Sequence, residues 1–307
     1  MYLVCNTQDK YALVFSAKVA SSLLQAICAE IFNDKDARYT FGFFESIAAL
    51  PTQTAKDVAT QLVDYRKIVI TRDPFERILS AYYNKIVSPY QNFTKSKFVC
   101  YYNAVSNMQK EFLDFNGLKI FERDLDLTSK VSVDLTFCEF ISFLKICKIN
   151  DVGLFRDPHF ETQLQVYQQI NYTKKLSAIY DWPVNFGEFI IKETPADKLK
   201  FIKLENEDFG QRLIDGLKWI LSPEIYNLHK NAFINLIFNE PIRKKTNKKH
   251  IGSYCGSFKP VELNLISKNK NNGSLPGLED MLSLEIINDI NFLYEREFEL
   301  FGYNNKL

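Results

Sequence analysis

A lysine lies within a turn of small residues, between a short apolar run and a stretch with helical spacing. The turn, at residues 16–22, reads SAKVASS, with Lys18 in third place. At a helix start the first backbone N–H groups have no partner within the helix and lie at the positive end of its dipole, so they favour a phosphate. Lys18 could neutralise charge that builds on a bridging oxygen. The alternative is a surface lysine beside an ordinary helix start. No G-x-x-x-x-G-K-[ST] pattern occurs, so the turn is not a Walker loop.

A second candidate is Arg72, which follows the apolar run KIVIT at 67–71. Pro74 suits the first turn of a helix and Asp73 can cap it. Ligands of open α/β sheets bind at the carboxyl ends of the strands, where Arg72 is expected. Two helical turns cover about 11 Å, so Arg72 and Ser80 could together bind a further anion. The alternative is that Arg72 pairs with a neighbouring carboxylate while Ser80 packs.

The elements that must position these residues alternate between strands and helices. Apolar runs predict strands at 12–15, 67–71 and about 199–204. Helical spacing predicts helices at 19–32, about 54–65, 74–87 and about 207–220, and a last helix within 283–303 that ends near Gly302. This order implies parallel strands with right-handed crossovers. We therefore expect an α/β fold, a P-loop-like parallel sheet flanked by helices, with a largely helical middle insertion.

The composition and charge of the chain limit the classes of protein to which it can belong. The 307 residues are 46% hydrophobic and 24% charged, which is typical of a globular chain. The net charge of +1 provides no general attraction to nucleic acid or membranes. No apolar run reaches the roughly 18 residues of a membrane span, and no signal peptide is recognised at the N-terminus. The six cysteines are scattered without a C-x-x-C pair, so we expect reduced thiols and no metal site.

Together the two stretches resemble the sulfotransferases that use 3′-phosphoadenosine 5′-phosphosulfate (PAPS). The closest resemblance is to the carbohydrate sulfotransferase family that includes the chondroitin 4-O and HNK-1 enzymes. The family pattern K-V-A/G-C/S-T/S stands here as KVASS at 18–22, and R-D-P-F-E-R-L-V-S-A-Y as RDPFERILSAY at 72–82. LYEREFELFGY at 293–303 resembles the family's closing helix, and FIKLENEDFGQRL at 201–213 its strand-then-helix near the acceptor. Residues 90–200 match poorly, and we expect acceptor specificity there.

The resemblance implies that the first motif holds the 5′-phosphosulfate and the second the 3′-phosphate. Family members often have Cys-Thr where this chain has two serines, whose hydroxyls can still donate. The basic loop at 243–257 would fold over the cofactor, unless it is a solvated loop or binds an anionic acceptor. The implied cofactor-binding residues are Ala17, Lys18, Val19, Ala20, Ser21, Ser22, Arg72, Ser80, Lys249, Ser253 and Tyr254.

The resemblance also defines the reaction, an in-line transfer of a sulfuryl group in which Lys18 serves the bridging oxygen. A base must take the acceptor's proton. His159, in FRDPHFETQ, weakly resembles the family's H-W-x-P-Q stretch and is expected to start a helix. Glu45 lies among aromatic residues, where burial could raise the pKa of its carboxyl. Both candidates stay open.

The sequence thus predicts one sulfotransferase domain over 1–307, with a cofactor core at about 11–85 and 200–303 and an acceptor side at about 90–200. PAPS would donate to a hydroxyl or amine of a carbohydrate or polar small-molecule natural product, releasing PAP without a metal. Small-molecule or glycan acceptors are the expected partners, and nucleic acid is not. We expect a soluble, cytoplasmic protein, with a trimmed Golgi luminal domain as the alternative. The rival functions are a nucleotide kinase and a non-catalytic PAP-binding module.

Overall fold

The structure is a computed structural model, and it describes residues 2–6, 9–16, 18–31, 62–83, 136–149, 159–164, 186–239 and 278–306. The chain divides into two compact units, and each is described by itself. The first unit comprises Met1–Asp73, Thr162–Pro241 and Glu299–Gly302, and the second comprises Pro74–Glu161, Ile242–Phe298 and Tyr303–Leu307.

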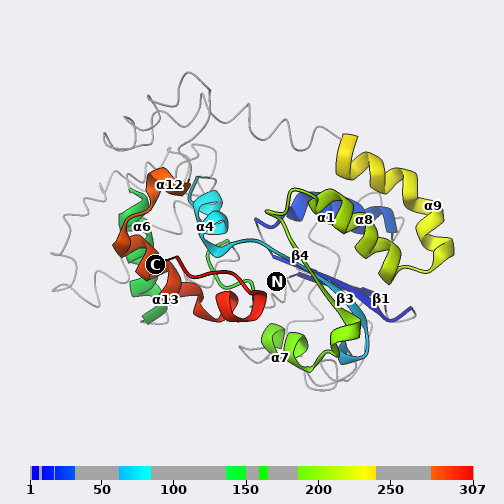
Figure 1. The fold of residues 1–307 in the computed structure, drawn as a ribbon, viewed down its shortest axis with the longest axis horizontal. Helices are drawn as coiled ribbons and strands as arrows, with labels where there is room; N and C mark the ends of the chain where they lie inside the picture. The colour runs from blue at the N-terminus through cyan, green and yellow to red at the C-terminus, as the bar shows by residue number, and fades with distance from the viewer. Residues whose placement is uncertain are drawn as a thin grey trace, which may run out of the picture. The chain divides into compact units, whose positions relative to one another are not determined.

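The first unit is built on a four-stranded sheet (Figure 1). The strands lie in chain order, β1 (Tyr2–Asn6), β2 (Tyr11–Phe15), β3 (Arg66–Thr71) and β4 (Leu199–Lys203). β2, β3 and β4 are parallel, so the predicted α/β class and the three predicted strands are confirmed. β1 pairs antiparallel with β2 and was not predicted. The carboxyl ends of β2, β3 and β4 therefore meet at one edge of the sheet.

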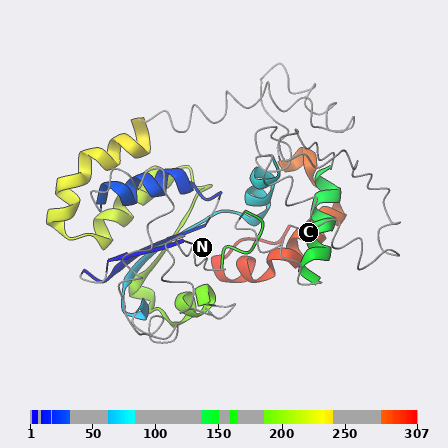
Figure 2. The ribbon, with the colours of Figure 1, turned by 180° about the vertical axis from the view of Figure 1, so that it is seen from behind.

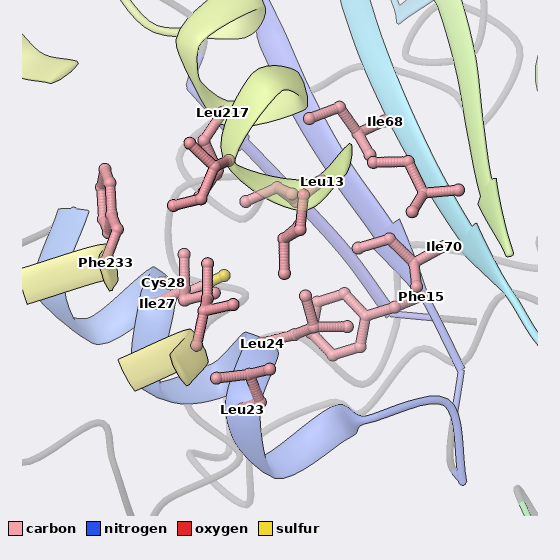
Figure 3. Close-up of a cluster of buried hydrophobic side chains, with 14 of the residues drawn as sticks. Leu13, Phe15, Leu23, Leu24, Ile27, Cys28, Ile68, Ile70, Leu217 and Phe233 are labelled. Atoms are coloured by element: carbon pink, nitrogen blue, oxygen red, sulfur yellow. The ribbon is translucent and has the colours of Figure 1, made fainter. Parts of the chain in front are cut away.

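Helices cover both faces of this sheet. α1 (Ser21–Ile31), α8 (Phe209–Ile220) and α9 (Pro223–Ile234) lie on one side and α7 (Phe186–Glu193) on the other (Figures 1 and 2). Leu13, Ile68 and Ile70 pack against Leu24 and Leu217 in the core between sheet and helices (Figure 3). At Gly216 a Cβ would lie 2.9 Å from Ile68 Cδ1, so the missing side chain lets α8 approach the sheet. This core fixes α1 and the turn that precedes it.

The second unit is helical and rich in aromatic residues. α4 (Pro74–Tyr82), α6 (Phe137–Ile149), α12 (Leu278–Met281) and α13 (Leu284–Phe301) contribute to its core. α6 begins with a capping box, in which the Thr136 N–H and the Glu139 N–H each bond to the other residue's side chain. Phe75 on α4 meets Phe298 on α13 with ring centroids 5.5 Å apart. Gly302 follows α13 with a φ of 60°, the left-handed C′ geometry expected of a glycine.

α13 is kinked at Tyr294, where φ is −124° and ψ is 24°. A kink frees helical carbonyls, which can then accept from donors outside the helix. Lys148 on α6 supplies them, because its Nζ lies 2.8 Å from both the Phe292 and Leu293 carbonyl oxygens. The kink is therefore part of the packing between α6 and α13.

One sequence expectation is changed by the structure, and two others extend beyond the residues that it describes. The helix predicted to start at His159 is wrong for residues 159–164, which form turns. α4 covers Pro74–Tyr82 of the helix predicted at 74–87. Residues 84–87, like most of the helix predicted at 54–65, lie outside the described residues. Among the described residues, no helix combines the length and the apolar character that crossing a bilayer needs.

Candidate functional site

The turn that carries Lys18 leaves β2 and enters α1 through a left-handed backbone. Lys18 has a φ of 67° and Ala20 a φ of 49°, values that non-glycine residues rarely adopt. Such a backbone costs about 1–3 kcal/mol per residue, so the surroundings must hold it. Val19, between the two, is fully buried in the core, and its N–H lies 3.4 Å from the Ser16 oxygen.

This backbone gathers N–H groups at the start of α1. The first bond of the helix runs from the Leu24 N–H to the Ala20 oxygen at 3.0 Å, so the preceding N–H groups have no acceptor inside the helix. Residues of left-handed conformation next to a helix start form the concave arrangement of N–H groups that binds anions. Ser21 is half-buried at the first helical position. Ala17 and the side chain of Ser22 lie outside the description. The turn has the chemistry of a phosphate or sulfate site.

Arg72 lies at the end of the neighbouring strand β3 and reaches this turn. Its Nη1 donates to the Lys18 backbone oxygen at 3.2 Å, and its side chain is 21% exposed. Glu205, just after β4, places Oε1 4.0 Å from Arg72 Nε. The structure thus brings Lys18 and Arg72, 54 residues apart, to one edge of the sheet. Two cationic side chains and a set of N–H groups make this edge suitable for a ligand with more than one anionic group.

The backbone around Arg72 is held by two side chains that the sequence analysis missed. Gln163 accepts from the Arg72 N–H at 3.0 Å and donates to the Arg72 oxygen at 2.8 Å. Glu205 accepts from the Asp73 N–H at 2.7 Å. Desolvation raises the pKa of Glu205, opposed by hydrogen bonds from its own N–H and that of Asp73 and by the charge of Arg72. Gln163 is the last residue of the stretch compared with H-W-x-P-Q, and Glu205 lies in the stretch 201–213. Both residues therefore belong to stretches that resemble the family, and this resemblance could have singled them out.

A comparison with protein families identifies the family of the chain that carries this site. The family model described as the sulfotransferase family matches residues 3–173, more than half of the chain. The chain belongs to the sulfotransferase family. The carbohydrate sulfotransferase type noted from the motifs fits this family. No significant match is found among curated proteins or among solved structures. The matched segment contains Lys18, Arg72 and Gln163, so the geometry described above lies within the part of this sulfotransferase that defines its family.

In the second unit of the sulfotransferase, Arg77 holds the turn that begins at His159. This arginine is fully buried and belongs to the motif at 72–82 that also contains Arg72. Arg77 Nη2 lies 3.4 Å from Glu297 Oε1 and 2.8 Å from the Glu161 oxygen. Its guanidinium lies 5.0 Å from the centre of the Tyr294 ring. The Tyr294 hydroxyl donates to the Phe160 oxygen. Burial raises the pKa of Tyr294, so this hydroxyl stays protonated and can donate. Arg77 therefore joins α4 and α13 to the 159–161 turn.

Two other predicted site residues belong to this second unit. Ser80 is half-buried on α4, and its pairing with Arg72 over one anion stays a prediction. His159 is also half-buried, and its backbone oxygen lies 3.5 Å from Arg77 Nη1. Its role as a base stays a prediction.

The remaining predicted residues lie outside the described parts of the chain. They are Glu45, Lys249, Ser253 and Tyr254. Another histidine, His229 on α9, has a structural role in the first unit. Its Nδ1 lies 3.0 Å from Glu30 Oε1, and its ring packs on Phe233. The described ranges bring together no three His, Cys, Asp or Glu side chains that could hold a metal ion.

Proposed function

We propose that this sulfotransferase uses PAPS as its donor and transfers the sulfuryl group to a hydroxyl or amine of a carbohydrate or polar small-molecule natural product. The observation that carries the proposal is the 3.2 Å contact between Arg72 Nη1 and the Lys18 oxygen. PAPS carries anionic groups at both ends of one nucleotide. Arg72 of the second motif contacts the turn of the first motif, which offers backbone N–H groups. This combination suits a ligand that is anionic at both ends.

The residues present fit the donor. The turn offers backbone N–H groups, a lysine and serine hydroxyls, a donor set that matches phosphate and sulfate oxygens. Arg72 offers a planar guanidinium, the cation best suited to a phosphate. In the proposal, Lys18 and residues 19–22 hold the 5′-phosphosulfate, while Arg72 and Ser80 hold the 3′-phosphate. Lys249, Ser253 and Tyr254 would cover the nucleotide.

When bound, PAPS supplies the sulfuryl group and leaves as PAP. The Lys18 ammonium group would donate a hydrogen bond to the oxygen on which charge develops, and the N–H groups of the turn would stabilise the neighbouring oxygens. Their rigid placement reduces the reorganisation that the reaction needs. His159 and Glu45 are the candidates for the base that takes the acceptor's proton. We further propose that both units belong to one sulfotransferase domain and that residues 90–200 select the acceptor.

A thermal-shift measurement tests the donor. PAP at about 100 times its Kd should stabilise the protein by about 2.7 kcal/mol, which raises Tm by about 5 °C. ATP with Mg²⁺ should change Tm little. A Tm that responds to ATP with Mg²⁺ and not to PAP would contradict the proposal and favour a kinase.

A transfer assay tests the reaction. Radiolabelled PAPS should pass its label to a member of a panel of carbohydrates and polar hydroxyl or amine compounds. Lys18→Ala should abolish transfer, while Lys230→Ala, at an exposed position of α9, should not change it. Full transfer by Lys18→Ala would remove this lysine from the mechanism, and PAP binding without transfer to any acceptor would favour a non-catalytic module.

A further inference from the structure

Gln163 occupies an unusual position beside the end of β3, because its side chain takes the place of a strand. It is 2% exposed. Its carboxamide bonds to both backbone groups of one residue, accepting from the Arg72 N–H at 3.0 Å and donating to the Arg72 oxygen at 2.8 Å. A neighbouring strand makes this kind of paired contact with its partner. Arg72 and Gln163 are 91 positions apart in the sequence, so this is a purely tertiary contact.

The hydrogen bonds along β3 explain why a side chain is needed there. The Thr71 oxygen accepts from the Leu204 N–H at 2.9 Å, and the Asp73 N–H donates to Glu205 at 2.7 Å, so both residues bond toward β4 and the residues after it. Arg72 lies between them, and successive residues of a strand bond to opposite sides. Its backbone therefore faces the side of β2, which ends at Phe15 before the chain turns toward Lys18. Buried N–H and C=O groups left there would lack partners.

We propose that Gln163 is a positioning residue for the nucleotide, acting through Arg72. It holds the Arg72 backbone where β2 no longer supplies a partner, and so directs the guanidinium to the Lys18 turn, 3.2 Å from the Lys18 oxygen. The inference rests on the proposed function, in which Arg72 binds the 3′-phosphate. A carboxamide offers one donor and one acceptor side by side, whereas the carboxylate of the same length only accepts. Gln163 thereby sets nucleotide affinity without touching the reacting atoms.

Two substitutions at position 163 separate hydrogen bonding from packing. Gln163→Met keeps the length of the side chain and removes both bonds. Gln163→Glu keeps an acceptor, but at neutral pH its carboxylate cannot donate to the Arg72 oxygen. A protonated carboxyl group can donate and accept, so it restores the pair of bonds at low pH. Burial raises the pKa of a carboxyl group, which brings this protonation into a mild range. Gln211→Glu, at an exposed position of α8, is the matched control.

PAP affinity is measured by calorimetry for the four proteins between pH 5.5 and 8.5, each value being divided by that of the wild type at the same pH. This ratio removes the titration of PAP and the effect of the charged groups near the site that each variant shares with the wild type, among them Glu205 and Asp73. At pH 8 both Gln163 variants should bind PAP at least about tenfold more weakly than the wild type. Gln163→Glu should recover most of this loss at pH 5.5, Gln163→Met should not, and Gln211→Glu should match the wild type throughout. With PAPS, the variants should raise KM and leave kcat within about twofold.

The opposite results are equally clear. Wild-type affinity in both variants, or a loss in Gln163→Glu that persists at low pH, would overturn the positioning role. If the wild type itself does not bind PAP, the proposed function fails instead. Hydrogen exchange of the Arg72 amide in the unliganded protein then still decides whether Gln163 holds Arg72. Exchange should be faster in Gln163→Met than in the wild type and Gln211→Glu, and equal rates would show that the contact does not hold the backbone.

Discussion

Arg72 and Arg77 lie five positions apart in one motif, and their surroundings are opposite. The Arg72 side chain is 21% exposed, donates to a backbone oxygen and lies 4.0 Å from a carboxylate. The Arg77 side chain is fully buried and lies 3.4 Å from Glu297, with a carbonyl and an aromatic ring beside it. An accessible cation at a sheet edge can bind an anion that arrives from solvent. An inaccessible cation that is already neutralised acts on the fold.

The two arginines also teach how one motif can serve two purposes. The first ends a strand at the edge where ligands bind. The second lies on the buried face of α4 with Ile78 and Tyr82. Removing one partner of a buried ion pair leaves the other as an uncompensated charge, so the cost falls on stability. Removing an edge cation costs ligand affinity. This contrast leads to four predictions.

The largest expected effect is that of Arg77→Ala. It leaves the Glu297 carboxylate buried without its cation and should lower the free energy of unfolding by about 3–5 kcal/mol. Urea unfolding followed by circular dichroism measures the change. Arg212→Ala, at an exposed position of α8, should stay within about 0.5 kcal/mol of the wild type. Equal stability of Arg77→Ala and Arg212→Ala would show that the buried pair does not support the fold.

Arg72→Ala should have the reverse profile. Loss of a charge-assisted bond to phosphate weakens PAP binding by about 10- to 100-fold, equivalent to about 1.4–2.8 kcal/mol. The free energy of unfolding should change by less than about 1 kcal/mol, since the side chain is partly exposed. Calorimetric titration with PAP and urea unfolding are run on the same preparations. Unchanged PAP affinity in this variant would contradict the assignment of Arg72 to ligand binding and of Arg77 to stability.

Tyr294→Phe sharpens the buried side of the comparison. The variant keeps the ring that packs on Arg77 and removes the hydroxyl that donates to the Phe160 oxygen. The unmet carbonyl should cost about 1–2 kcal/mol of unfolding free energy. A double-mutant cycle with Arg77→Ala should show coupling, because both side chains hold the 159–161 turn. Additive effects would mean that the two act independently.

Lys67 on β3 is a second buried cation for the comparison, and it donates to backbone carbonyl oxygens. It is fully buried, and its Nζ donates to the Tyr65 oxygen at 2.9 Å and to the Val63 oxygen at 3.3 Å. Desolvation, with the charge of Lys198 adding to it and that of Asp64 opposing it, lowers the pKa of Lys67 from 10.5 to about 8. Between these values the unfolded chain binds more protons, so stability should rise with pH.

The pH dependence is measured against a variant, since tyrosines and thiols also titrate in alkali. From pH 8 to pH 9 the unfolding free energy of the wild type should gain about 1 kcal/mol relative to Lys67→Met. Lys200→Met, at an exposed position of β4, is the control, and its difference from the wild type should stay constant. A constant difference for Lys67→Met as well would contradict the lowered pKa.

The sequence by itself determined the local elements and the places where chemistry could occur. Apolar runs and helical spacing located β2, β3, β4, α1 and α8 within a few residues, because periodicity reflects which face is buried. The alternation of strands and helices implied parallel pairing, and that pairing puts the residues after β2 and β3 at one edge. Gly302 could be assigned to a helix end because its lack of a side chain suits a positive φ.

Only the tertiary structure decided what distant residues do to one another. The helix predicted at His159 fails because the Phe160 and Glu161 carbonyls accept from Tyr294 and Arg77, and the Leu164 N–H bonds to Thr162 Oγ1 instead of to a helical carbonyl. Likewise, no spacing rule gives the contact of Gln163 with Arg72 or that of Arg77 with Glu297. Periodicity encodes burial over a few turns of chain, whereas these hydrogen bonds join segments more than 80 residues apart. Their geometry exists only after the core has brought the segments together.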